Sequence, residues 1–194
     1  MTMKNLLDLA SNNAQISLPI LFGILIYIIL QIVTPPVSNP KYPFKTTGTF
    51  EYVTDGDTIN FKIGKLSTSC RIYGVDSPEK YESDKMIRDT KHVSKKATIE
   101  AGNLASDYAK NYFIKNKKYD LTIISKDKYN RYVVIVKNGF STYNESIVAA
   151  GYAVAIIKYV KDSKLRNILH KAQSDAMRKN KGLWKNYATI MQNL

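Results

Sequence analysis

Hydrophobic and polar positions divide the chain into an apolar N-terminal segment and a longer part with regular spacing. Residues 16–33 read ISLPILFGILIYIILQIV, 18 positions without a charged side chain. A helix of that length covers about 27 Å, close to the thickness of a bilayer's hydrocarbon core. The pattern favours a transmembrane signal-anchor helix at 16–33, after a tail at 1–15 and before a proline-rich spacer at 34–46.

A cleaved signal peptide is the alternative, and the protein would then be secreted. Its apolar run would be shorter, and small residues would mark the cleavage site. The sequence TPPVSNPKYP follows the run instead, so a single-pass membrane protein is favoured. The flanking charges are few, with Lys4 and Asp8 before the run and Lys41 and Lys45 after it. They leave open which membrane and which side of it the remaining chain occupies.

Alternating apolar positions predict strands in the first part of the remaining chain. The expected strands cover 48–54, 58–63, 66–75, 120–125 and 132–136. Apolar spacings of three and four predict helices over 93–113 and 163–180, with a short helix between them that begins at an Asn144 N-cap. Residues 80–92 are expected to form a loop.

Five strands with a helix inserted between the third and the fourth favour an α+β fold. We expect a five-stranded oligonucleotide-binding (OB-fold) barrel with three helices at 47–185, followed by a tail at 186–194.

The charge balance narrows the class of partner. The chain has 29 Lys and Arg against 16 Asp and Glu, a net charge of +13, and most of this surplus lies beyond residue 45. A polyanion is therefore expected, either nucleic acid or an anionic membrane surface. The single cysteine, Cys70, excludes an intrachain disulfide and a cysteine-cluster zinc site, and the two histidines make a histidine-rich metal centre implausible.

Clustered carboxylates need an explanation in so basic a chain. Asp57 closes the turn between the first two expected strands, and Asp76 and Glu79 follow the third. If the second and third strands form a hairpin, Asp57 and Asp76 lie at the same end of the sheet. Oxygen ligands there suit a hard cation such as Ca²⁺ or Mg²⁺. Glu79 is placed to hold a metal-bound water or to take a proton from it.

Two arginines stand out among many lysines. Arg71 lies five residues before Asp76, and Arg131 closes the 126–131 turn. A guanidinium binds two phosphate oxygens at once, which a lysine does not. Each fragment alone is common as a turn or a surface ion pair. Their combination indicates a phosphodiester site, with a cation and two arginines around the phosphate.

Three motifs stand in a fixed order: VTDGDTI at 53–59, RIYGVDSPE at 71–79 and DKYNR at 127–131. With KGLW at 181–184, they closely resemble the staphylococcal nuclease (thermonuclease-like) family over roughly residues 47–185. The resemblance implies an OB-fold and Ca²⁺-dependent hydrolysis of DNA or RNA, with little sequence preference and with 3′-phosphate ends.

The resemblance also implies roles for individual residues. Asp57 and Asp76 would be the Ca²⁺ carboxylates, and the main-chain carbonyl of Ser77 a further ligand. Glu79 would be the general base. The remaining catalytic residues would be Arg71 and Arg131, which bind the phosphate and stabilise charge in the transition state.

Substrate binding is implied for Lys128, Tyr129 and Tyr159. A shift of register would place Ile157 at the last of these positions. The chain departs from the family pattern at Ser77, where threonine is common, and at Asn130, where glycine is common.

Three classes of function compete. The first is the membrane-anchored nuclease, with DNA or RNA as substrate, a lipid bilayer contacted through residues 16–33, and no protein partner indicated. The second is a tethered, non-catalytic nucleic-acid-binding barrel. The third is a basic domain that only lies on anionic lipid. The complete set of acids and arginines favours the nuclease, because carboxylates have no evident use at an anionic lipid surface.

Overall fold

The computed structural model describes residues 18–33, 40–89 and 93–194, which divide into a unit ending at Pro40 and a unit covering Lys41–Leu194. The first unit contains helix α2 (Leu18–Val33), 16 residues long. Across the described ranges, no helix is both long enough and apolar enough to cross a membrane. Residues 1–17 and 34–39, which hold the expected tail, the start of the expected span and part of the spacer, lie outside the described residues. The span at 16–33 stays a prediction.

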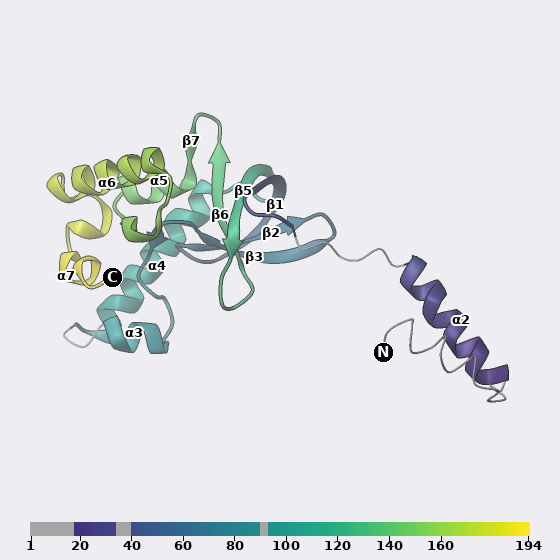
Figure 1. The fold of residues 1–194 in the computed structure, drawn as a ribbon. Coiled ribbons are helices and arrows are strands. Elements are labelled where there is room, and N and C mark those ends of the chain that lie inside the picture. Colours follow the sequence, from purple (N-terminus) through teal and green to yellow (C-terminus); the bar gives the residue numbers. More distant parts are fainter. Residues whose placement is uncertain (1–17, 34–39, 90–92) are drawn as a thin grey trace. The chain divides into compact units, whose positions relative to one another are not determined.

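Five strands form a closed barrel in the second unit (Figure 1). They are β1 (Phe44–Asp55), β2 (Thr58–Ile63), β3 (Leu66–Ile72), β5 (Lys118–Lys126) and β6 (Tyr132–Asn138). Antiparallel pairs give the order β3-β2-β1-β5-β6, and a parallel pairing of β3 with β6 closes the ring, with Arg71 opposite Val133. The predicted five-stranded OB-fold barrel is confirmed, although β1 begins inside the expected spacer.

A glycine ends the third strand earlier than expected. Gly74 has a φ of +71°, and a Cβ at this position would lie 2.5 Å from Val160 Cγ2. The chain turns there and continues as β4 (Val75–Asp76), which pairs with β8 (Val154–Ala155). The turn removes Asp76 from the barrel sheet and places it in a separate ribbon.

Five α-helices accompany the barrel within the described residues, where three were expected. They are α3 (Asp84–Asp89), α4 (Lys95–Tyr112), α5 (Tyr143–Ala149), α6 (Ser163–Arg178) and α7 (Ala188–Gln192). Helix α3 corrects the predicted loop, since Ser83 Oγ accepts from Met86 N and the Met86 side chain is buried. Helix α7 lies in the expected tail and buries Ile190 and Met191 against the second core cluster.

Asn144 is not the N-cap of α5. Thr142 caps the helix, because its hydroxyl accepts from Glu145 N at 3.2 Å. Asn144 is fully buried, accepts from Val136 N at 3.0 Å and donates to the carbonyl of Tyr73 at 2.9 Å. Its amide therefore joins α5 to β6 and to the turn that leads into β4, which a sequence pattern typical of a cap did not reveal.

The interior of the barrel is apolar and contains side chains from every barrel strand, including Phe50, Ile59, Ile72, Ile123 and Val134. Full burial of a side chain of this size adds about 1.5–3 kcal/mol to the stability of the folded state. A second cluster packs Trp184 with Ala101 and Ala105 of α4. Helix α4 thus has a packed apolar face, and its backbone is fixed beside the loops that carry the acidic residues.

Candidate active site

Closure of the barrel places the two arginines of the sequence motifs on neighbouring strands. Arg71 lies near the end of β3, and Arg131 immediately precedes β6, whose Val133 pairs with Arg71. Both arginines line one cleft of about 1460 Å³, together with Asp55 and Glu79. Residues far apart in the chain therefore present two guanidinium groups and two carboxylates to the same space.

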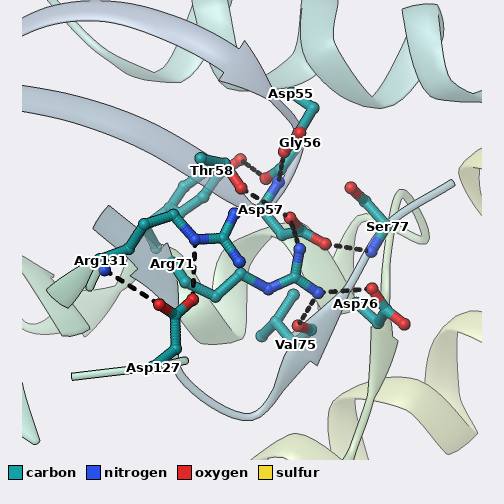
Figure 2. A network of polar contacts seen from close by, with 11 residues as sticks. Asp55, Gly56, Asp57, Thr58, Arg71, Val75, Asp76, Ser77, Asp127 and Arg131 are labelled. Atoms are coloured by element: carbon teal, nitrogen blue, oxygen red, sulfur yellow. Dashed lines mark hydrogen bonds and ion pairs between the residues drawn. The ribbon is translucent and has the colours of Figure 1, made fainter. Parts of the chain in front are cut away.

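Arg71 links two buried carboxylates (Figure 2). Its Nη1 pairs with Asp57 Oδ1, and its Nη2 lies 2.6 Å from Asp76 Oδ1. The carbonyl of Val75 accepts from Nη2 at 3.4 Å. Burial alone would lower the pKa of Arg71, but the charges of Asp57 and Asp76 raise it above its usual value. Arg71 is thus a permanent cation in a pocket of carboxylates.

The three residues expected to hold a metal lie close together, and all are buried. Asp57, Asp76 and Ser77 are only 1%, 4% and 2% exposed. Asp57 Oδ2 accepts from Ser77 N at 2.7 Å, and Thr58 Oγ1 donates to Asp57 Oδ1. None of the three is among the residues that line the cleft, whereas Arg71, which pairs with Asp57 and Asp76, does line it.

The oxygen donors of Asp57, Asp76 and Ser77 are of the chemical type that binds a hard cation. Carboxylate and carbonyl oxygens are what Ca²⁺ prefers, and the buried Ser77 hydroxyl has no hydrogen-bond partner in the described part of the chain. Arg71 supplies the positive charge at this site in the structure. No group of three or more His, Cys, Asp or Glu side chains in the described ranges is placed to hold a metal ion.

Asp55 also joins the site, although no role beyond a turn was expected for it. It is half-buried and lines the cleft, and its Oδ1 accepts from Asp57 N at 3.2 Å. Burial, and then the charge of Asp57, raise the pKa of Asp55 to about 8. The close spacing of two aspartates around one glycine was the signal that could have identified it.

Stability should depend on pH through Asp55. Because its folded pKa is raised to about 8, the folded chain keeps a proton that the unfolded chain loses near pH 4. In chelator, the free energy of unfolding should therefore fall between about pH 4 and 8, by at most about 1.4 kcal/mol per pH unit. Urea titrations of Asp55→Asn should show a flatter profile, and the exposed Asp120→Asn should not. If the free energy of unfolding falls equally with pH in the unmodified chain and in both variants, the raised pKa of Asp55 is contradicted.

Glu79 lines the cleft from the loop after β4 and is half-buried. Helix α4 packs directly against its backbone at Gly102. A Cβ on Gly102 would lie 2.5 Å from both the carbonyl carbon and the carbonyl oxygen of Glu79. Because Gly102 has no side chain, helix α4 can approach the Glu79 backbone closely and hold it in place. The sequence did not indicate this role of Gly102.

Asp127 organises the turn that carries Arg131. Its Oδ2 accepts from Arg131 Nε at 2.7 Å, and its Oδ1 accepts from the backbone N of both Tyr129 and Arg131 at 2.9 Å. Burial would raise the pKa of Asp127, but the hydrogen bonds from Arg131 outweigh it and lower the pKa. Asn130 has a φ of +64°, a left-handed conformation that asparagine tolerates.

Tyrosines and lysines form the rim of the cleft. Tyr129 is 67% exposed and Tyr159 is 63% exposed, and both line the cleft, whereas Ile157 does not. Lys128 Nζ lies 5.0 Å from the centre of the Tyr129 ring, and Arg131 Cζ lies 5.4 Å from it. The three residues expected to bind substrate therefore line the same cleft as the arginines.

Tyr143 is a further supporting residue that no motif indicated. It is fully buried on α5, and its hydroxyl donates to the carbonyl of Gly56 at 2.7 Å. Burial, and then the charge of Asp57, raise its pKa well above the usual value. Tyr143 thus anchors the turn between Asp55 and Asp57 from the protein interior. Only the tertiary structure identifies this contact.

The fold and the cleft define an OB-fold protein with a cluster of arginines and carboxylates suited to phosphodiesters. A sequence model of the family described as staphylococcal nuclease homologue matches residues 69–186. The chain belongs to this family, and at the family level it is a nuclease. The matched range includes Arg71, Asp76, Glu79 and Arg131, while Asp57 precedes it.

Two of the proteins to which the chain is similar are thermonucleases. Thermonuclease of Staphylococcus hyicus is 28% identical over 156 residues, covering 74% of this chain and 84% of the relative. Thermonuclease of Staphylococcus intermedius is 27% identical over 157 residues, covering 75% and 85%. An uncharacterised protein of Methanocaldococcus jannaschii is 27% identical over 145 residues, covering 68% of each chain. All three alignments are longer than the 69–186 match, so the similarity extends beyond that range.

Proposed function

We propose that the chain is a Ca²⁺-dependent endonuclease that cleaves DNA, RNA or both with little sequence preference and leaves 3′-phosphate ends. The observation that carries the proposal is the shared cleft, in which Arg131 meets Arg71 and Glu79 although it comes from a segment far from them in the chain. Tyr129 and Tyr159 at the rim offer rings on which bases of any sequence can stack.

The two arginines and Glu79 have distinct tasks in this proposal. Arg71 and Arg131 bind the phosphate oxygens and stabilise the charge that grows there in the transition state. Glu79 accepts the proton of a water that attacks the phosphorus in line. The bond from phosphorus to the 5′ oxygen breaks, the 5′ oxygen takes a proton, and the phosphate stays on the 3′ side.

Asp57, Asp76 and the carbonyl of Ser77 would hold the Ca²⁺. When bound, the cation polarises the phosphate and lowers the pKa of nearby water. The surplus of carboxylates over arginines in this pocket supports the assignment. Arg71 already pairs with Asp57 and Asp76, so the fold brings both carboxylates to a cationic group.

The full chain, purified in detergent, tests the proposal on plasmid DNA and on RNA. Cleavage should require Ca²⁺ and stop in excess chelator, and the fragments should need a phosphatase before their 3′ ends can be extended. Glu79→Gln should lose cleavage, whereas Glu82→Gln should retain it, because Glu82 is exposed and pairs with Lys95. A chain that binds DNA but cuts nothing with any divalent cation would instead be a binding module.

The close approach of α4 to Glu79 gives a further prediction. Gly102→Ala should lower cleavage about a hundredfold, since the new methyl group must displace the Glu79 backbone and a misplacement of about 1 Å has effects of that size. Asn103→Ala, on the exposed side of the same helix, is the control and should cleave normally. Cleavage rates with saturating substrate provide the measurement. Normal activity of Gly102→Ala would show that Glu79 does not depend on this contact.

Membrane anchoring through residues 16–33 also stays a proposal. It rests on the uncharged composition of that segment. Alkaline extraction of membranes that contain the full chain tests it, because a spanning segment stays with the lipid and a peripheral protein is released.

A further inference from the structure

The strand directions place three turns at the end of the barrel opposite the cleft. Strand β2 leads away from the acidic turn and β3 returns to Arg71, so the β2–β3 turn lies at the far end. Strand β6 leads away from Arg131, which places the β6–β7 turn, between β6 and the short strand β7 (Ser141–Thr142), at the far end as well. In Figure 1 this turn projects upward from the barrel, while the 127–131 turn extends downward. The α4–β5 loop precedes β5, which runs toward the cleft.

Each of these turns exposes one large apolar side chain. Leu66, which follows the β2–β3 turn as the first residue of β3, is 72% exposed, Ile114 in the α4–β5 loop is 60% exposed, and Phe140 in the β6–β7 turn is fully exposed. We call the surface formed by these three turns the distal face. One exposed apolar side chain is ordinary on a protein surface, so it is the gathering of three on turns at the same end of the barrel that calls for an explanation.

Hydrogen bonds join the three turns into one surface. Glu51 lies between two of them, since its carboxylate accepts from Ser67 Oγ and its carbonyl accepts from Lys115 Nζ. Lys117 Nζ donates to Asn138 Oδ1 at 3.3 Å, which joins the α4–β5 loop to the base of the β6–β7 turn. The segments that carry the three apolar tips are therefore connected to one another.

Lysines surround the apolar tips. The exposed lysines of the same turns and adjacent strand ends are Lys62, Lys65, Lys115, Lys117 and Lys118. Lys62 and Lys118 lie in one row across the sheet, because both pair with Thr49 of β1. The acids on these segments are Glu51 and Asp120, so the distal face carries a net positive charge.

We propose that the distal face docks on an anionic lipid surface, with Phe140, Leu66 and Ile114 inserted among the headgroups. An interface of this kind accepts apolar tips and attracts lysines at the same time. A nucleic acid would satisfy the lysines only, because isolated leucine and isoleucine side chains offer no flat surface for stacking. The carboxylates of the cleft lie at the other end of the barrel, so they do not oppose docking, and the cleft stays open to its substrate. This inference does not depend on the proposed nuclease activity.

A fluorescent label at the tip of the β6–β7 turn tests the proposal in the full chain. Phe140→Cys introduces the thiol, and the native Cys70 is fully buried and does not compete for the dye. An environment-sensitive dye is attached, and the chain is reconstituted in vesicles of phosphatidylcholine alone or with about one third phosphatidylserine. The apolar N-terminal segment is present in both, so the difference between them reports on the folded domain. Met177→Cys on α6 carries the control label.

The dye at position 140 should shift to shorter wavelength only with phosphatidylserine, and high salt should reverse the shift. Lys115→Gln combined with Lys117→Gln should lower the ratio of docked to undocked label about thirtyfold. The control label should not respond. The proposal is overturned if the dye at 140 ignores anionic lipid, or if it responds to an oligonucleotide and not to the vesicles. Normal cleavage by the labelled chain, or its unchanged near-ultraviolet circular dichroism if it does not cleave, shows that the fold is intact.

Discussion

Replacing Arg131 with alanine is expected to lower the cleavage rate about a thousandfold while leaving stability almost unchanged. The guanidinium lines the cleft, and a charge-stabilising donor of this kind contributes a factor of about 10²–10³ or more. Its ion pair with Asp127 is partly exposed, so the loss of that pair costs about 1 kcal/mol or less. Single-turnover cleavage and urea unfolding measure the two effects separately.

Two further variants sharpen this result. Arg131→Lys keeps the charge but loses the planar two-point contact, so it should recover only a small part of the rate. Arg166→Ala removes an arginine that donates to the carbonyl of Val160, outside the set of catalytic residues, and should cleave normally. A rate for Arg131→Ala within a few-fold of the unmodified chain would remove Arg131 from the mechanism.

The second large effect is expected for Arg71→Ala, which should destabilise the fold as well as abolish cleavage. It leaves Asp57 and Asp76 buried without their shared counter-charge. Removing one partner from a buried ion pair typically costs about 3–5 kcal/mol. Urea titration at neutral pH in chelator measures the loss, and Ca²⁺ should restore part of it by neutralising the same carboxylates.

A double-mutant cycle separates charge from packing. Asp57→Asn keeps the shape of the side chain and removes one buried charge, so Arg71→Ala with Asp57→Asn should be more stable than Arg71→Ala alone. Arg178→Ala is the matched control, because Arg178 pairs with Asp175 on an exposed part of α6. A loss below about 1 kcal/mol for Arg71→Ala would mean that the buried carboxylates do not rely on Arg71.

Much of the fold could be predicted because its signals are local. Alternation placed β2 at Thr58–Ile63 without error, and the spacing of apolar residues found α4 and α6 to within a few residues. The short helix α3 was missed, since six residues of mixed charge show no apolar periodicity. The Ser83 hydrogen bond to Met86 N is local, but the burial of Met86 that holds the segment in place depends on the rest of the fold.

The candidate site also has a part that the sequence predicted and a part that it did not. The motifs named the arginines and most of the acids, because residue type and spacing are visible along the chain. They did not indicate Asp55 as a member of the cleft, Gly102 as the contact behind Glu79, or Tyr143 as the anchor of the acidic turn. The roles of Gly102 and Tyr143 depend on Glu79 and Gly56, which lie more than twenty residues away in the chain, and a local pattern carries no information about them. Asp55 differs, because the two aspartates around Gly56 are a local signal.

The sequence by itself determined the class of barrel, the basic charge and the chemical types of the site residues, because these depend on composition and on neighbouring positions. The tertiary structure decided which of them meet. Parallel pairing of β3 with β6 joins Arg71 to the strand that follows Arg131, and the turn at Gly74 brings Asp76 back to Arg71. These contacts form because the apolar interior of the barrel packs in only one closed arrangement, and that arrangement fixes the polar groups at its ends.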